Sequence, residues 1–88
     1  MARKRVIVRG RVQGVFFRDT TRRMAESRGV AGWVRNNPDG TVEAVFEGPD
    51  DAVDDMVRFA QEGPRGASVE HVEVDDEPLE GLTGFRIA

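Results

Sequence analysis

The stretch Val30 to Glu47, VAGWVRNNPDGTVEAVFE, decides the fold predicted for this chain. Two runs rich in β-branched residues flank Asn37-Pro38-Asp39-Gly40, whose residue types are those of a tight turn. The second run alternates, with Val42, Ala44 and Phe46 on one face. The residues on its other face are Thr41, Glu43 and Glu47. Residues 30–47 are therefore predicted to form a β-hairpin, with strands over 30–36 and 41–47.

An amphipathic helix is predicted on each side of this hairpin. The first runs from about Phe17 to Arg28, with Gly29 placed just past its end. The second follows Gly48-Pro49-Asp50-Asp51, because proline and acidic residues favour a helix start. Gly63-Pro64 ends it. Its core-facing residues, spaced by three and four, are Val53, Met56, Val57 and Ala60.

Three further strands complete the predicted order. The first covers Arg5 to Arg9 and is broken by Gly10 to Gly14, the fourth covers Ser68 to Val74, and a short last strand covers Phe85 to Ile87. The order β-α-β-β-α-β plus a C-terminal strand predicts an α+β, ferredoxin-like split βαβ sandwich. In it, two helices pack on one face of an antiparallel sheet. We expect one domain over residues 1–88.

Composition and charge narrow the function. The chain has no cysteine and one histidine, which excludes disulfides, thiolate catalysis and histidine-rich metal sites, so we expect no metal and no cofactor. Val6-Ile7-Val8 is too short for a signal-peptide core or a membrane span, so we expect a cytoplasmic protein. We also expect a monomer. Residues 1–36 carry ten Lys/Arg and two Asp/Glu, whereas residues 37–88 carry three and fourteen. This asymmetry indicates either two solvated surfaces or an anionic ligand among the basic residues.

The segment Gly10 to Arg18, GRVQGVFFR, joins the first strand to the first helix. Backbone N–H groups of such a loop and of the first helical turn lack partners, and together with the helix dipole they form an anion site. Gly14 lets the backbone approach a ligand closely, and the Arg18 guanidinium can bind two phosphate oxygens. The alternative is that the glycines only turn the chain and that Arg18 is a surface residue.

The second strand ends at Asn36, which shares a face with Val34 and reaches the rim of the predicted sheet. Asparagine before a turn is often structural, but Asn37, directly before Pro38, is the better candidate for that task. Asn36 is therefore a candidate for binding or catalysis. Trp33 and Arg35 lie on the opposite face, and we interpret them as packing or solvated side chains.

In these two segments the sequence resembles the acylphosphatase family. Residues 10–18 resemble its signature loop, and Gly32 to Glu43, GWVRNNPDGTVE, resemble its second signature. The resemblance implies metal-free hydrolysis of carboxyl-phosphate anhydrides. The implied substrates are small acyl phosphates of the acetyl phosphate, 1,3-bisphosphoglycerate and carbamoyl phosphate class, with inorganic phosphate or sulfate as competing anions. It implies that Arg18 binds the phosphoryl group and that Asn36 orients the attacking water. The loop amides implied to hold the other oxygens are those of Gln13, Gly14, Val15, Phe16, Phe17 and Arg18.

Three alternatives remain at this point. A non-catalytic phosphate-binding or regulatory module would keep Arg18 and the loop but would not need Asn36. An RNA-binding domain of this topology would carry aromatic residues on its central strands, whereas the first strand has none, and we expect no nucleic-acid partner. A unit of a larger carbamoyl-transfer protein of hydrogenase maturation would resemble the same family, but we expect a free-standing enzyme.

Overall fold

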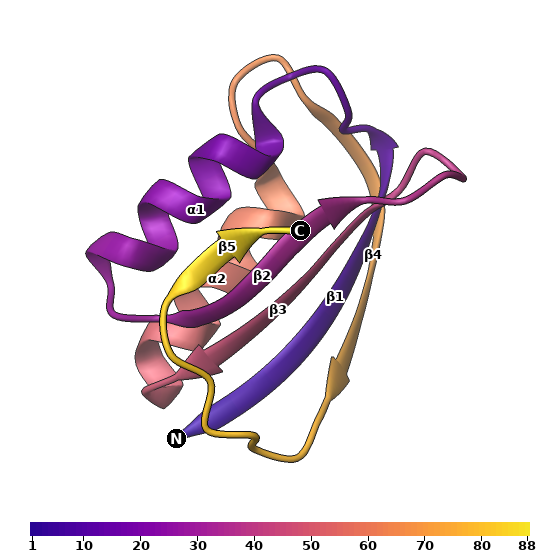
Figure 1. Ribbon diagram of the computed structural model, residues 1–88. Coiled ribbons are helices and arrows are strands. Elements are labelled where there is room, and N and C mark those ends of the chain that lie inside the picture. Colours follow the sequence, from indigo (N-terminus) through magenta and orange to yellow (C-terminus); the bar gives the residue numbers. More distant parts are fainter.

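The computed structural model describes all residues from Met1 to Ala88 and contains two helices and five strands (Figure 1). In chain order these are β1 (Ala2–Arg11), α1 (Phe17–Ser27), β2 (Ala31–Asn36), β3 (Val42–Gly48), α2 (Asp50–Glu62), β4 (Ser68–Asp76) and β5 (Phe85–Ile87). The predicted element order is confirmed.

The five strands form one sheet in the order β4-β1-β3-β2-β5. Four of them pair antiparallel, with β1 between β3 and β4 and with β3 between β1 and β2. Both helices lie on the same face of the sheet (Figure 1), with α1 against β2 and β5 and with α2 against β1, β3 and β4. The ferredoxin-like fold class is therefore confirmed. We call the other sheet face, which neither helix covers, the open face.

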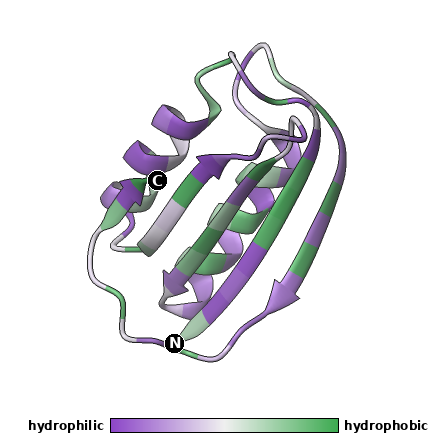
Figure 2. Ribbon diagram, turned by 45° about the vertical axis from the view of Figure 1, so that its right-hand side comes forward, coloured by the Kyte–Doolittle hydropathy of each residue, from purple (hydrophilic) through white to green (hydrophobic).

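The hydrophobic core lies between the sheet and the helices. Strand residues alternate, so that hydrophobic and hydrophilic bands follow one another along the strands in Figure 2. Phe46 of β3 and Met56 of α2 are the largest fully buried side chains, at 1% and 0% exposure. The other members of this cluster are Val6, Val8, Val12, Phe17, Ala25, Val30, Val34, Val42, Ala44, Val53, Ala60 and Phe85. Neither helix is long and apolar enough to cross a membrane.

The first strand is longer than the sequence predicts. It starts at Ala2 and continues through Gly10 and Arg11, both still paired with β4 across a register shift between Arg9 and Gly10. Gly10 has φ +131°, and a Cβ there would lie 2.2 Å from the carbonyl oxygen of Ser68. The prediction that Gly10 breaks the strand is therefore wrong, because this glycine is what allows the irregular pairing to continue.

The last strand runs parallel to β2, so the sheet is mixed and not wholly antiparallel as predicted. The polar loop after β4 passes the end of the sheet where β1 begins, and β5 therefore enters beside β2 from the same end (Figure 1). The Glu47 carboxylate holds this loop, since it accepts hydrogen bonds from the N–H groups of Glu80 (2.9 Å) and Leu82 (2.8 Å). The residue pattern within a single strand does not indicate in which direction a neighbouring strand runs.

The turn between β2 and β3 has the predicted position. The N–H of Gly40 donates to the carbonyl of Asn37 (3.1 Å), and the N–H of Asn37 donates to the carbonyl of Thr41 (2.8 Å). Asp39 Oδ1 accepts from the Thr41 hydroxyl (2.7 Å) and from the Thr41 N–H (3.0 Å). These bonds hold the pKa of Asp39 below its usual range. Asn36 therefore directly precedes a turn that several hydrogen bonds hold closed.

Candidate active site

The loop between β1 and α1 has a backbone shape that suits an anion. Gly14 has φ +75°, and Phe16, which caps α1, lies in the left-handed region at φ 59°, ψ 26°. Phe16 is the only non-glycine residue with positive φ, a conformation that costs about 1–2 kcal/mol for an L-residue. Left-handed residues that alternate with ordinary ones turn successive N–H groups toward one side, which is the geometry of anion-binding nests.

The N–H groups of this segment are free of partners within the chain. The first N–H at the start of α1 to donate a backbone hydrogen bond is that of Thr20, to the carbonyl of Phe16 at 3.1 Å. The N–H groups of residues 13–19 donate none. The loop and the first turn of α1 therefore combine free donors with the positive end of the helix dipole.

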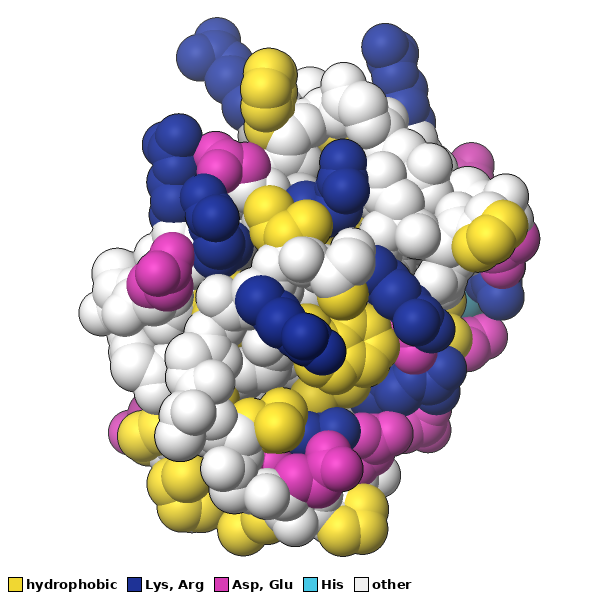
Figure 3. All heavy atoms as spheres, viewed as in Figure 1, with side chains coloured by type: hydrophobic (Ala, Val, Ile, Leu, Met, Phe, Trp, Pro, Cys, Tyr) yellow, Lys and Arg dark blue, Asp and Glu magenta, His cyan; other side chains and the backbone are white.

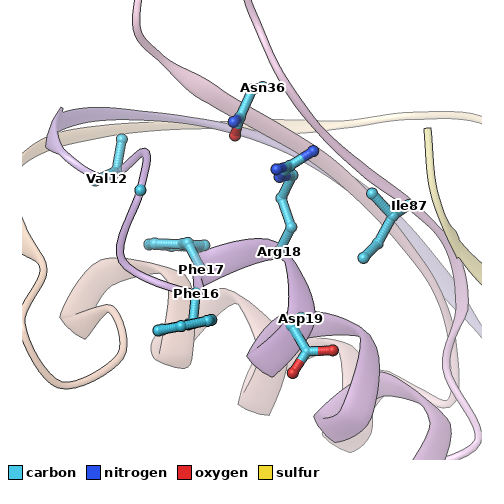
Figure 4. Close-up of a pocket in the computed structure, with 8 residues that line it drawn as sticks. Val12, Phe16, Phe17, Arg18, Asp19, Asn36 and Ile87 are labelled. Carbon is cyan, nitrogen blue, oxygen red and sulfur yellow. The ribbon is translucent and has the colours of Figure 1, made fainter.

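Arg18 lies in the first turn of α1, and its side chain extends toward β2 (Figure 4). The nearest acidic residue in the sequence, Asp19, does not neutralise it. Asp19 pairs with Arg22 (3.3 Å) and Arg23 (3.0 Å), and in Figure 4 its carboxylate points away from the Arg18 guanidinium. The Arg18 charge is therefore available to an anion.

Asn36 is the last residue of β2 and points toward the helix side of the sheet, as Val34 does. Its Oδ1 atom is buried and has no hydrogen-bond partner in the protein. Buried polar atoms without a partner are rare, because leaving one unsatisfied costs about 1–3 kcal/mol. Figure 4 shows the Asn36 amide and the Arg18 guanidinium approaching each other across the site from β2 and α1. The structure thus brings the two predicted residues together.

A hollow of about 330 Å³ lies between these two side chains. Of the residues predicted to bind the phosphoryl group, Gly14, Phe16, Phe17 and Arg18 line this hollow together with Asn36. The remaining lining residues, which the sequence did not identify, are Val12, Asp19 and Ile87. Gln13 and Val15 do not line it. The site is therefore polar on the side of Arg18 and Asn36, with apolar walls around them.

Comparison with known proteins identifies the family. The sequence model of the acylphosphatase family matches residues 4–87. The acylphosphatases of Rubrobacter xylanophilus and Haloarcula marismortui are 63% and 56% identical to this chain over 97% of its length, which covers 78% and 93% of their own lengths. The crystal structure of the Bacillus subtilis acylphosphatase superposes with a TM-score of 0.94, at 40% identity, over 100% of this chain and 99% of the other. The chain belongs to the acylphosphatase family.

The protein is accordingly an enzyme, an acylphosphate phosphohydrolase, and not a non-catalytic phosphate-binding module. The family has acyl phosphates as its substrate class, which agrees with a loop whose unpaired N–H groups suit an anion. In this acylphosphatase no three His, Cys, Asp or Glu side chains are grouped so that they could hold a metal ion. The only permanently charged cation lining the hollow is Arg18.

Gln13 contributes through its side chain in a way that the sequence did not indicate. Its Nε2 donates to the carbonyl oxygens of Asn37 and Thr41, both at 2.9 Å. The loop between β1 and α1 is therefore bonded directly to the turn that follows Asn36. This fixes the loop amides relative to Asn36, and no spacing rule in the sequence relates positions 13 and 37.

Proposed function

We propose that this acylphosphatase binds the phosphoryl group through Arg18 and the free loop amides, and that Asn36 orients the attacking water, without a metal ion. The observation that supports it best is the buried, unpartnered Oδ1 atom of Asn36 in the same hollow as Arg18. An acceptor left in that position is ready to accept a hydrogen bond from a water molecule. The substrates are small acyl phosphates such as acetyl phosphate, 1,3-bisphosphoglycerate and carbamoyl phosphate.

The chemistry of the leaving group explains why few side chains are enough for catalysis. When water attacks phosphorus, the bond between phosphorus and the carboxyl oxygen breaks, and the departing carboxylate takes the electron pair. The pKa of its conjugate acid is about 4, so the carboxylate leaves without protonation by a general acid. The proton of the attacking water passes to solvent or to a phosphate oxygen. The enzyme therefore needs to position the reactants and to stabilise charge.

Arg18 and the loop supply that stabilisation. The guanidinium can bind two of the phosphoryl oxygens with parallel hydrogen bonds, and the N–H groups of residues 13–18 can bind the others. Fixed donors of this kind stabilise a transition state without reorganising, as an oxyanion hole does. Together they provide the positive charge that a magnesium ion supplies in many other phosphoryl-transfer enzymes. Inorganic phosphate, the product, and sulfate fit the same cradle and compete with the substrate.

Asn36 acts on the water and not on the phosphate. An amide is too weak a base to remove a proton, so its contribution is to hold the water in line with the leaving carboxylate. Its Oδ1 accepts from the water, while its position at the end of β2, across from Arg18, sets the direction of attack. Asn36 therefore acts on turnover more than on phosphate affinity.

A monomer of one domain, spanning residues 1–88, forms part of the same proposal. The buried hydrophobic side chains form a single cluster between sheet and helices. On the open face, the charges of β1 and β3 pair with one another inside the chain, so this face does not offer an apolar surface for a second copy. All groups named in the mechanism come from one chain.

The direct test measures hydrolysis of acetyl phosphate by the purified chain in buffer with EDTA, beside a sample with added magnesium. Equal rates well above the uncatalysed rate are expected, and a rate that collapses in EDTA would contradict the metal-free mechanism. Asn36→Ala is expected to lower kcat while leaving the inhibition constant of inorganic phosphate within about twofold of wild type. A parallel loss of phosphate affinity would assign Asn36 to binding and not to the water.

A further inference from the structure

On the open face, the Glu43 carboxylate is bonded to both neighbours of Asn36 in the chain. Its Oε1 accepts from Arg35 Nη2 (2.9 Å) and Nε (3.3 Å) and from Asn37 Nδ2 (3.2 Å). Arg35 Nε also donates to Asn37 Oδ1 (3.1 Å). The other carboxylate oxygen, Oε2, accepts from Arg5 Nε. The residues before and after Asn36 are therefore held by one anion on the side of the sheet opposite to the site.

The carboxylate of Glu43 is well fixed. Its side chain is only 5% exposed and lies between β1 and β2, each of which contributes a cation. Figure 3 shows basic and acidic side chains next to each other on the side of the molecule seen in Figure 1. Burial alone would raise the pKa of Glu43, but the hydrogen bonds from Arg5, Arg35 and Asn37 outweigh it and hold the pKa below its usual value. Glu43 is therefore charged throughout the neutral range.

Asn36 itself has little else to hold its orientation. Its Oδ1 atom makes no hydrogen bond within the protein, so the direction of the amide depends on the backbone that carries it. Asn36 ends β2, and the chain turns away directly after it. Because successive strand side chains point to opposite faces, a roll of the strand end about its axis would swing Asn36 away from Arg18. Bonds to Arg35 and Asn37 on the opposite face resist that roll.

We propose that Glu43 is a positioning residue for the hydrolysis reaction, which fixes Asn36 through Arg35 and Asn37. This inference rests on the proposed role of Asn36 in orienting water. Glu43 does not contact the hollow and does not touch the substrate. Its loss therefore affects the alignment of the attacking water, and hence kcat, while Arg18 and the loop amides continue to bind the phosphoryl group.

Glu47 provides a matched control on the same strand. It lies on the same face four residues further on, is 3% exposed, and pairs with Arg3. Its other bonds go to the N–H groups of Glu80 and Leu82, at the opposite end of the sheet from the turn. Glu43→Gln and Glu47→Gln thus remove similar buried charges and both lower stability. Only the change at Glu43 loosens the residues on either side of Asn36.

The experiment measures kcat and KM for acetyl phosphate, the inhibition constant of inorganic phosphate and urea unfolding, for Glu43→Gln, Glu47→Gln and Asn36→Ala. For Glu43→Gln we expect kcat to fall about tenfold, since a displacement of about 1 Å in a reacting group can cost about 100-fold. Its KM and phosphate inhibition constant should stay within about twofold of wild type. Glu47→Gln should keep kcat within about twofold.

Results that differ from these expectations overturn the inference, and they show which part of it is wrong. A folded Glu43→Gln enzyme with wild-type kcat, or an equal fall in kcat for Glu47→Gln, would show that Glu43 only stabilises the fold. If Glu43→Gln does not fold, Asn37→Ala tests the positioning role instead, because it removes one contact of Glu43 without removing a charge. An unchanged kcat of Asn37→Ala would overturn the inference. If Asn36→Ala keeps its kcat, the proposed role of Asn36 fails as well. If Asn36→Ala loses turnover and Glu43→Gln does not, only the positioning role fails.

Discussion

Replacing Arg18 by alanine and by lysine separates the contribution of its charge from that of its planar shape. A guanidinium that binds two phosphoryl oxygens makes two charge-assisted hydrogen bonds, each contributing about 1.5–3 kcal/mol. Losing both costs about 3–6 kcal/mol, which at 1.36 kcal/mol per factor of ten lowers kcat/KM by about 10²- to 10⁴-fold. Lysine keeps the charge but not the paired geometry, so Arg18→Lys should lose about 10- to 100-fold.

The same substitutions should leave the fold intact. Arg18 stands in the first turn of α1, where the dipole is positive and a cation is slightly unfavourable. The side chain is exposed, and the neighbouring Asp19 pairs with Arg22 and Arg23 instead. Arg18→Ala should therefore unfold in urea within about 0.5 kcal/mol of wild type, or slightly above it. A loss of activity cannot then be attributed to unfolding.

Initial rates of acetyl phosphate hydrolysis, inhibition by inorganic phosphate and urea unfolding give the three readings required. We expect Arg18→Ala to lose both turnover and inhibition by phosphate, with Arg18→Lys between it and wild type. The reasoning is refuted if the folded alanine variant keeps more than about a tenth of the wild-type kcat/KM, since the loss of two charge-assisted bonds would then be absent. An unchanged phosphate inhibition constant would refute it equally.

Two further predictions concern the bonds of Gln13 in the loop before α1 and the buried carboxylate of Glu47. Gln13→Ala removes the bonds from the loop to the carbonyls of Asn37 and Thr41, so we expect kcat/KM to fall by about tenfold; a value equal to wild type would show that the loop holds its shape alone. The second is that acid destabilises the enzyme partly through Glu47. Hydrogen bonds from the Glu80 and Leu82 N–H groups hold its pKa below the unfolded value of about 4.3. Its contribution is thus fully present above that pH and is lost as pH falls through the folded pKa. Glu47→Gln should flatten the acid limb of a urea-derived stability profile, and a profile parallel to wild type would contradict this.

The parts of the fold that follow from local periodicity were predictable. The hairpin over residues 30–47, both helices and the last strand at Phe85–Ile87 appear within a few residues of their predicted bounds. Arg18 and Asn36 were identified from a loop and a strand end, and the structure brings both to one hollow. What these predictions share is that each depends on residues close together in the chain.

The predictions that were wrong concern contacts between residues far apart in the chain. Gly10 was predicted to end β1, but its φ of +131° fits the register shift in the pairing of β1 with β4. This shift is visible only when both strands are known. The parallel direction of β5 follows from the path of the loop after β4, and that path is held by Glu47. Ile87 lines the hollow because β5 packs against α1, which is far from it in the sequence. No window of sequence contains both partners of any of these contacts.

The alternation of β3 placed Glu43 on the face away from the core. On a sheet that helices cover on one face only, a side chain on the other face is usually exposed to solvent. The structure shows instead that this face carries a second, ionic layer, in which Glu43 is nearly as buried as the core residues. On the helix side, Asn36 borders the hollow and its Oδ1 atom has no hydrogen-bond partner in the protein. Support for Asn36 then has to come through the strand itself, from Arg35 and Asn37 on the opposite face. In the proposed mechanism, strand alternation thus lets β2 present Asn36 to the substrate on one face while Glu43 anchors its neighbours on the other.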